Sequence, residues 1–219
     1  MPARPEFDAP AWSGRAHFVM LDSDFGTGQR FLAAWRHWQA DPERPRQLHY
    51  LAPGADPRAA APEHMEPQLR AAWPPAVPGL HRLSFDGGRV ILDLMFGAPE
   101  LWLAQIDAHV DAFHLGAAQF SAPVPACLAR LARPGATLQA GAPQAPLLAA
   151  AGFVCHLAPG AAQLSAVFAG RQAPAPRFSN AAPAQRHVIG AGLAGAAACE
   201  RLAARGWRLT LLERHARPA

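Results

Sequence analysis

Two glycine-rich turns have the residue types and spacing that bind nucleotide-like ligands. The first, DSDFGTG, starts at Asp22 and ends at Gly28, between a short apolar run and a stretch with helical spacing. The second, GAGLAG, starts at Gly190 and ends at Gly195. A glycine turn between a strand and a helix lets backbone approach a ligand, and the helix N-terminus adds a positive field. We therefore expect binding chemistry at these two turns.

The second turn carries the stronger signal. Gly190 would form the tight turn, Gly192 would let backbone approach a pyrophosphate, and Gly195 would let helix and strand pack closely. Glu213 follows 18 residues after Gly195, at the end of the next expected strand, where its carboxylate would accept a hydrogen bond from a ribose hydroxyl. A chance glycine turn would leave Glu213 unexplained. The pattern predicts a dinucleotide-binding βαβ unit.

The first turn resembles the nucleotide loop of S-adenosylmethionine-dependent methyltransferases. The alternative is an ordinary strand-to-helix loop that uses glycine for its conformation. The candidate cofactor-binding residues of this turn are Asp22, Asp24, Phe25, Gly26, Thr27 and Gly28.

Alternating strands and helices surround the first turn. Helical spacing of apolar residues and short apolar runs predict the elements in chain order. They are strands 17–21 and 47–52, helix 62–73, hairpin strands 80–85 and 89–96, helix 101–108, strand 110–115, helix 125–131, extended 136–140, helix 145–151, and paired strands 153–157 and 164–168. Asp86-Gly87-Gly88 favours the hairpin turn because these residues accept positive φ. We expect an α/β Rossmann-like fold with a parallel sheet and an antiparallel edge.

The chain divides at a Pro-rich stretch without periodicity. We expect a methyltransferase-like domain over 1–170, a linker over 171–185 and a βαβ unit over 186–219. The second unit holds a strand at 187–189, a helix to 204 and a strand at 208–212. The sequence stops six residues after Glu213, so we expect an incomplete, truncated dinucleotide-binding domain.

Composition narrows the class of protein. The 219 residues include 51% hydrophobic residues and carry a net charge of +4, with every basic side chain an Arg. The arginines are dispersed, so the charge permits a nucleic-acid partner without arguing for one. Cys127, Cys155 and Cys199 have no metal-ligand spacing, and we expect no metal. Neither a signal peptide nor a membrane span is expected, which predicts a cytoplasmic protein.

The combination resembles the MnmC family, bifunctional enzymes that complete 5-methylaminomethyl-2-thiouridine at the tRNA wobble position. The matching stretches are 25–50, 71–97, VDAF at 110–113, LARLARPGATL at 128–138, AAGF at 150–153 and VIGAGLAG at 188–195. In that family a C-terminal FAD-dependent oxidoreductase removes a carboxymethyl group, and an N-terminal domain methylates the resulting amine. The resemblance implies S-adenosylmethionine and FAD as cofactors and tRNA as partner.

The chain departs from the family pattern at its chemistry. Asp24 stands at a glycine of the family's ETGFGTG turn, and Gly54 stands at the Glu that holds the cofactor ribose. Gly116 stands at the catalytic Asp, and Ala98 at the Asp beside the adenine. A basic segment of the family becomes AQLSA at 162–166. We therefore expect this chain to be weak or inactive in methylating 5-aminomethyl-2-thiouridine.

Three alternatives stay open at this point. The chain could be an enzyme with altered ligands, a non-catalytic remnant, or a scaffold that binds tRNA or protein. His114, next to the lost Asp, is expected to be structural rather than a substitute base. Trp35, Trp38 and Trp73 are expected in the core, and Asp86 and Asp111 at a turn and a strand end. The oligomeric state is not predicted.

Overall fold

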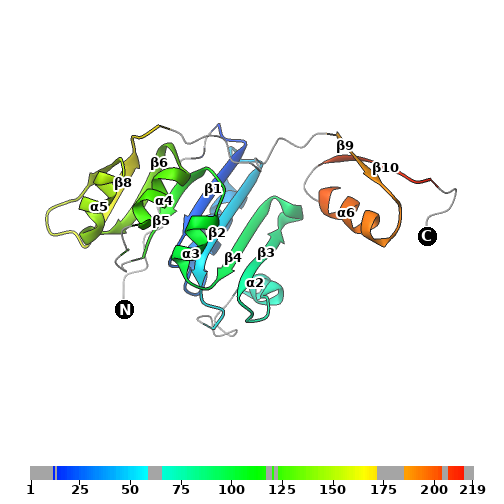
Figure 1. Cartoon of the computed structure of the whole chain (residues 1–219), viewed down its shortest axis with the longest axis horizontal. Coiled ribbons are helices and arrows are strands. Elements are labelled where there is room, and N and C mark those ends of the chain that lie inside the picture. The colour runs from blue at the N-terminus through cyan, green and yellow to red at the C-terminus, as the bar shows by residue number, and fades with distance from the viewer. Residues whose placement is uncertain are drawn as a thin grey trace.

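The fold is described from a computed structural model, for residues 12, 14–58, 66–116, 120, 123–171, 185–203 and 207–214. The expected linker lies almost entirely outside these residues, as do positions 117–119 beyond Gly116. Within them, eight strands form one sheet in the order β3-β4-β2-β1-β5-β6-β8-β7 (Figure 1).

The centre of the sheet is parallel and both of its ends are antiparallel. β1 pairs in parallel with β2 and β5, β2 with β4, and β5 with β6, whereas β3, β8 and β7 run antiparallel to their neighbours. The strands are β1 (His17–Asp22), β2 (Gln47–Ala55), β3 (Gly79–Phe85), β4 (Val90–Phe96), β5 (Val110–His114), β6 (Ala132–Gly141), β7 (Phe153–His156) and β8 (Gln163–Phe168). The expected Rossmann-like α/β sheet with antiparallel edge strands is confirmed.

Helices cover both faces of this sheet. They are α1 (Gln29–Ala40), α2 (Pro67–Ala72), α3 (Pro99–Gln105), α4 (Pro123–Leu131) and α5 (Ala145–Ala150). Successive strand side chains point to opposite faces, so Met20 and Tyr50 join the core under α1, whereas Leu21 and Leu51 join the core under α3, α4 and α5. Helices α3 and α4 are seen on the near side of the sheet in Figure 1.

The tryptophans belong to the core, as expected. Trp35 and Trp38 are buried, and Trp73 packs partly buried against the same cluster. Leu115, Leu128 and Leu131 are buried under the other face. These residues keep an apolar framework around the first turn.

The β3–β4 hairpin turns as the sequence predicts. Asp86, Gly87 and Gly88 form a short 3-10 segment, η2 (Asp86–Gly88), and all three have positive φ. The Asp86 carboxylate accepts hydrogen bonds from the Trp35 indole and the Gln39 amide of α1. Asp86 therefore both forms the turn and ties the hairpin to α1.

Element boundaries differ from expectation mainly where no periodicity marks them. α2 begins at Pro67, and residues 62–65 of the expected helix lie outside the described part. β6 begins at Ala132 rather than 136, ahead of Pro134 and Gly135, and its register with β5 shifts there. A second 3-10 segment, η3 (Ala142–Gln144), joins β6 to α5.

The second unit has the expected βαβ order. β9 (Gln185–Ile189) pairs in parallel with β10 (Arg208–Leu212), and α6 (Leu193–Ala203) connects them. The parallel ladder runs the full length of both strands. None of the described α6 residues is buried, and Ile189 and Leu193 are 86% and 89% exposed.

No described helix is long and apolar enough to span a membrane. No group of three or more His, Cys, Asp or Glu side chains could hold a metal ion among the same residues.

Candidate functional site

The first candidate site lies where the central strands end. In open α/β sheets, ligands bind at the carboxyl ends of the strands, where the strand order reverses direction. β1 is flanked by β2 on one side and β5 on the other, so this point lies between β1 and β5. The pairing continues past the strand end, because the Ser23 N–H donates to the His114 carbonyl at 3.0 Å. The sheet thus places the first glycine turn beside the end of β5.

Asp22 ends β1 and is engaged inside the protein. Its side chain is 1% exposed, and its Oδ2 accepts from the Tyr50 hydroxyl at 2.5 Å and from Arg30 Nη1 at 3.1 Å. Its Oδ1 accepts from the Asp24 N–H at 2.9 Å. Burial, followed by the Asp22 charge and this hydrogen bond, raises the pKa of Tyr50 well above its usual value. Both carboxylate oxygens of Asp22 therefore stabilise the turn itself.

The turn keeps its glycine geometry for reasons of packing. Gly26 and Gly28 have φ of 53° and 77°. A Cβ on Gly28 would lie 3.0 Å from the Phe25 ring and 3.1 Å from Leu69. Phe25 is buried and stacks on Trp73. Phe25 is thus a core residue, and the left-handed conformation at Gly28 starts α1.

Asp24 and Gly116 face each other across the site. A Cβ on Gly116 would lie 2.9 Å from Asp24 Cβ and 3.2 Å from Asp24 Oδ2. Contacts under 3.0 Å are essentially not seen for real side chains, so any larger residue at 116 requires Asp24 to move. The two positions share one volume, and Asp24 fills it.

Gly54 lies near the end of β2 and has no side chain that could bind a ligand. Its φ is +82°, and a Cβ there would lie 2.9 Å from Pro99 Cβ at the start of α3. A side chain reaching toward a ribose hydroxyl would need both a different backbone conformation and a displaced Pro99. The residues present therefore do not fit the carboxylate-held ribose that the family resemblance implies for S-adenosylmethionine.

His114 lies next to Asp22 in register and joins the same edge. Its Nδ1 is 3.4 Å from Gln139 Oε1. Burial lowers the pKa of His114 below its ordinary value of 6.5, the charge of Arg30 adds to this, and Asp22 and Gln139 oppose it. At neutral pH the imidazole is uncharged and held by Gln139, which agrees with the structural role expected for it.

Sequence reasoning missed a buried ionic network on the sheet. Asp93 in β4 is 2% exposed, and accepts from His49 at 2.8 Å and from Arg82 Nε and Nη2 at 2.7 and 2.6 Å. Burial raises its pKa, but the hydrogen bonds from Arg82 and His49 outweigh that and lower it to about 2. A lone Asp in the fully buried strand VILDLMF was the available signal.

Asp111 lies near the start of β5, as expected, and is also buried. Its Oδ2 accepts from the Val19 N–H at 2.9 Å, and its Oδ1 is 3.2 Å from Arg133 and 3.6 Å from Arg15. Burial raises the pKa of Asp111, against the hydrogen bond from Val19. This cluster joins β1 to β5 at the end opposite the glycine turn.

The second glycine turn brings its predicted residues together. Gly190 has a φ of +96°, and a Cβ on Gly195 would lie 1.8 Å from the Gly190 carbonyl oxygen. Gly192 faces open space. Glu213 Oε2 accepts from the Ala191 N–H at 2.6 Å, so the acid lies directly at the turn. The tight turn, the close packing and the nearby acid all take the places that the motif requires.

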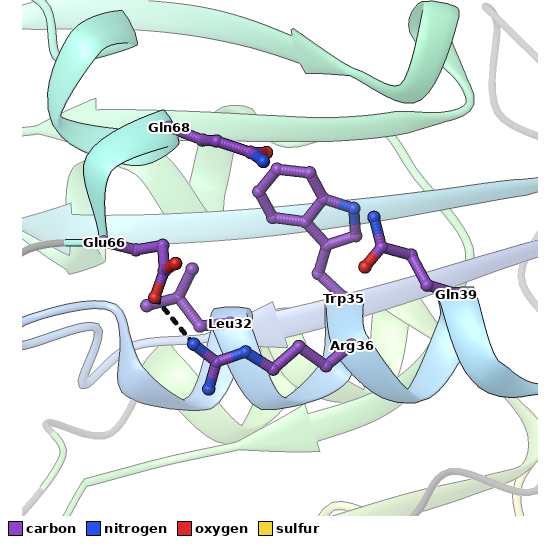
Figure 2. Close-up of a pocket in the computed structure, with 6 residues that line it drawn as sticks. All are labelled: Leu32, Trp35, Arg36, Gln39, Glu66 and Gln68. Carbon is purple, nitrogen blue, oxygen red and sulfur yellow. Dashed lines mark hydrogen bonds and ion pairs between the residues drawn. The ribbon is translucent and has the colours of Figure 1, made fainter.

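A small pocket lies away from both turns. It holds about 60 Å³ between α1 and the start of α2. Figure 2 shows Trp35, Arg36 and Gln39 from α1 facing Glu66 and Gln68, with Arg36 paired to Glu66. The Arg36–Glu66 distance is 2.6 Å. Arg36 and Glu66 bind each other, and the pocket contains none of the predicted site residues.

The sheet order and the two turns define a class: a Rossmann-like α/β methyltransferase fold followed by a dinucleotide-type βαβ unit. The family described as "NAD(P)-binding Rossmann-like domain" matches residues 188–219, which agrees with the second part. Comparison with curated proteins then gives the particular relatives.

The chain is 42% identical over 239 residues to the tRNA 5-methylaminomethyl-2-thiouridine biosynthesis bifunctional protein MnmC of Cupriavidus metallidurans, covering 95% of this chain and 36% of that protein. It is equally identical over 234 residues to the MnmC protein of Thiobacillus denitrificans, covering 95% and 38%. The chain thus spans little more than a third of the length of these relatives. The resemblance to MnmC is confirmed, and the chain corresponds to an amino-terminal, MnmC-like portion.

A solved structure, MnmC2 from Aquifex aeolicus, aligns with a TM-score of 0.48 and 15% identity, covering 75% of this chain and 57% of that one.

Proposed function

We propose that this chain is the methyltransferase-like part of an MnmC-type protein that modifies the wobble uridine of tRNA in the cytoplasm. The reaction assigned is methylation of 5-aminomethyl-2-thiouridine, with weak or no turnover in this chain. The weak or absent turnover is supported by the residues at the edge of the first site. This edge retains the turn of Gly26 and Gly28 but has glycine at 54 and 116.

Two ionisable groups at this edge, Asp22 and His114, are not available to take a proton from the amine. An amine attacks a methyl group only when it is neutral and oriented, and a free carboxylate is the natural group to hold it and take its proton. Asp22 cannot do so, because Tyr50, Arg30 and the Asp24 N–H occupy its oxygens. His114 is neutral but lies beside Gln139 rather than in open space.

The dispersed arginines do not favour a pure RNA-binding scaffold. Arg82 is bound to Asp93, and Arg36 to Glu66. Arg130 donates to the carbonyls of Leu103 and Ile106 near the end of α3. Guanidinium groups engaged in this way are less available for phosphates. Contact with tRNA is therefore assigned to the reaction rather than to a general basic surface.

The second unit is proposed to bind FAD, as in the bifunctional family. Its support is the position of Glu213 at the turn, where a carboxylate can accept from a ribose hydroxyl. The proposed division keeps the methyltransferase-like domain at 1–170, the linker at 171–185 and the FAD unit at 186–219. Gln185 already lies in β9, so the strand begins at the last linker residue.

Calorimetric titration with S-adenosylmethionine tests the proposal. We expect no heat up to millimolar cofactor, because residue 54 offers the ribose no acceptor. The matched variant is the Gly54→Glu/Pro99→Gly double substitution, which adds the acceptor and removes the Pro99 side-chain atoms in its way. Micromolar binding by the unaltered chain, with normal methyl transfer to tRNA carrying 5-aminomethyl-2-thiouridine, would overturn the assignment of weak activity.

A further inference from the structure

The Asp24 carboxylate occupies the space into which a side chain at 116 would project. The Cβ of such a side chain would lie 2.9 Å from Asp24 Cβ, 3.1 Å from Cγ and 3.2 Å from Oδ2. Two residues that follow different strands therefore reach one point, just beyond the carboxyl ends of β1 and β5. A carboxylate at this point can be supplied from either side of the site, and here it comes from the β1 side.

The backbone of Asp24 is fixed, while its carboxylate is available. The Asp24 N–H donates to Asp22 Oδ1, and its carbonyl accepts from Arg30 Nη1 at 3.3 Å. Within the described ranges, no hydrogen bond or ion pair to the Asp24 side chain is found, and the residue is exposed. The turn thus holds the residue in place without using its charged group.

The charges at this edge leave one negative charge uncompensated. Arg30 pairs with Asp22 at 3.1 Å, and His114 is uncharged at neutral pH because burial lowers its pKa. Asp24 adds a second carboxylate with no further cation from the described residues beside it. An exposed carboxylate of this kind attracts a cation that can also donate hydrogen bonds.

We propose that Asp24 is the cation-binding carboxylate of this edge and holds the protonated aminomethyl group of the wobble uridine, in place of a side chain at 116. The inference rests on the proposed function for the choice of ligand. The geometry adds that positions 24 and 116 are interchangeable as sources of the carboxylate, provided that the other is glycine.

Anticodon stem-loop RNAs test this directly with the full chain. One RNA carries 5-aminomethyl-2-thiouridine at the wobble position, and its control carries 5-methyl-2-thiouridine, which lacks the amine. We expect the unaltered protein to prefer the amine-bearing RNA about tenfold, as a charge-assisted hydrogen bond implies. Asp24→Asn should abolish that preference, whereas Glu100→Gln, which neutralises an exposed carboxylate of α3, should keep it.

A variant in which residues 24 and 116 are exchanged distinguishes loss of the carboxylate from loss of the fold. Asp24→Gly should lose the preference, and Asp24→Gly/Gly116→Asp should regain it, because the carboxylate returns from the β5 side. Equal binding of both RNAs by the unaltered protein, or failure of the swap in a folded protein, would overturn the inference and leave tRNA contact standing. Absence of binding to either RNA would overturn the inference and the proposed function together.

Discussion

The two glycine turns differ in the sheet that holds them and in the groups that lie beside them. The first lies in a complete eight-stranded sheet, but its edge has glycine at 54 and 116. The second lies in a unit whose described residues form two strands and one helix, yet its Glu213 carboxylate lies at the turn and accepts from the Ala191 N–H. The size of a sheet therefore does not determine whether an acidic side chain lies at its glycine turn. The glycine and acid pattern indicates which groups lie at a turn, whereas the strand order indicates which sheet holds that turn.

Breaking the second turn should have the largest effect. Gly195→Ala places a Cβ 1.8 Å from the Gly190 carbonyl oxygen, an overlap with backbone that only a changed helix position relieves. We expect a loss of about 3 kcal/mol or more, enough to unfold the βαβ unit. Hydrogen exchange over β9, α6 and β10 should rise to that of an unfolded chain.

Gly192→Ala is the matched control, since a Cβ there meets nothing within 4 Å. Unchanged exchange in Gly195→Ala would mean that the second unit does not hold the close turn described.

The second largest effect is expected from a substitution at Gly54 in the first site. Gly54→Ala forces a left-handed conformation on a residue with a Cβ and places that atom 2.9 Å from Pro99. We expect a loss of about 2–3 kcal/mol in the free energy of unfolding, combining strain and overpacking. Chemical denaturation measures it.

In a Pro99→Gly background, which removes the Pro99 Cβ, the overpacking part should disappear and the strain should persist. An equal loss in both backgrounds would contradict the Pro99 contact.

Low pH should remove the stabilisation that the buried, ionised Asp93 gives to the larger sheet. The pKa of Asp93 is about 2 in the folded protein against an ordinary 3.8. A depressed folded pKa means that the stabilisation is present above pH 3.8 and is lost as the pH falls toward 2. We expect about 2 kcal/mol of unfolding free energy to disappear over that window.

The measurement is the difference between the unaltered chain and Asp93→Asn at each pH. Asp111, whose raised pKa acts in the opposite direction, cancels in this difference. A difference that does not change with pH would contradict the ionic network around Asp93.

The smallest effect is expected from a substitution at Gly116 in the first site. Gly116→Ala should cost about 1 kcal/mol while Asp24 is present, because its Cβ crowds that side chain. In an Asp24→Gly background the same substitution should be close to neutral. A double-mutant cycle on the free energy of unfolding gives the coupling between positions 24 and 116, and a coupling of zero would contradict the shared volume.

Much of the fold followed from local patterns. Apolar runs located β1, β2, β4 and β5, and Asp86-Gly87-Gly88 located the hairpin because only such residues accept three positive φ angles in sequence. The positive φ of Gly190, the close packing at Gly195 and the position of Glu213 at the turn fit the motif, because it encodes local geometry. Patterns of short range were therefore enough for these features.

Contacts between distant strands were not predictable in the same way. His49, Arg82 and Asp93 come from three strands, and nothing in their spacing says that they meet. The shared volume of Asp24 and Gly116 likewise depends on where β1 and β5 end relative to each other. Such contacts depend on register across the sheet, which sequence periodicity does not specify.

The central place of β1 also has a consequence for synthesis. Its neighbour β2 follows closely in the chain, but β5, its other neighbour, emerges much later, and the Val19–Asp111 contact spans 92 residues. At 5–20 residues per second, a ribosome needs roughly 5 to 20 seconds to make that stretch. During that interval a nascent chain can complete the β3-β4-β2-β1 half of the sheet while the other edge of β1 stays open. A template of unpaired backbone is then exposed in the growing chain.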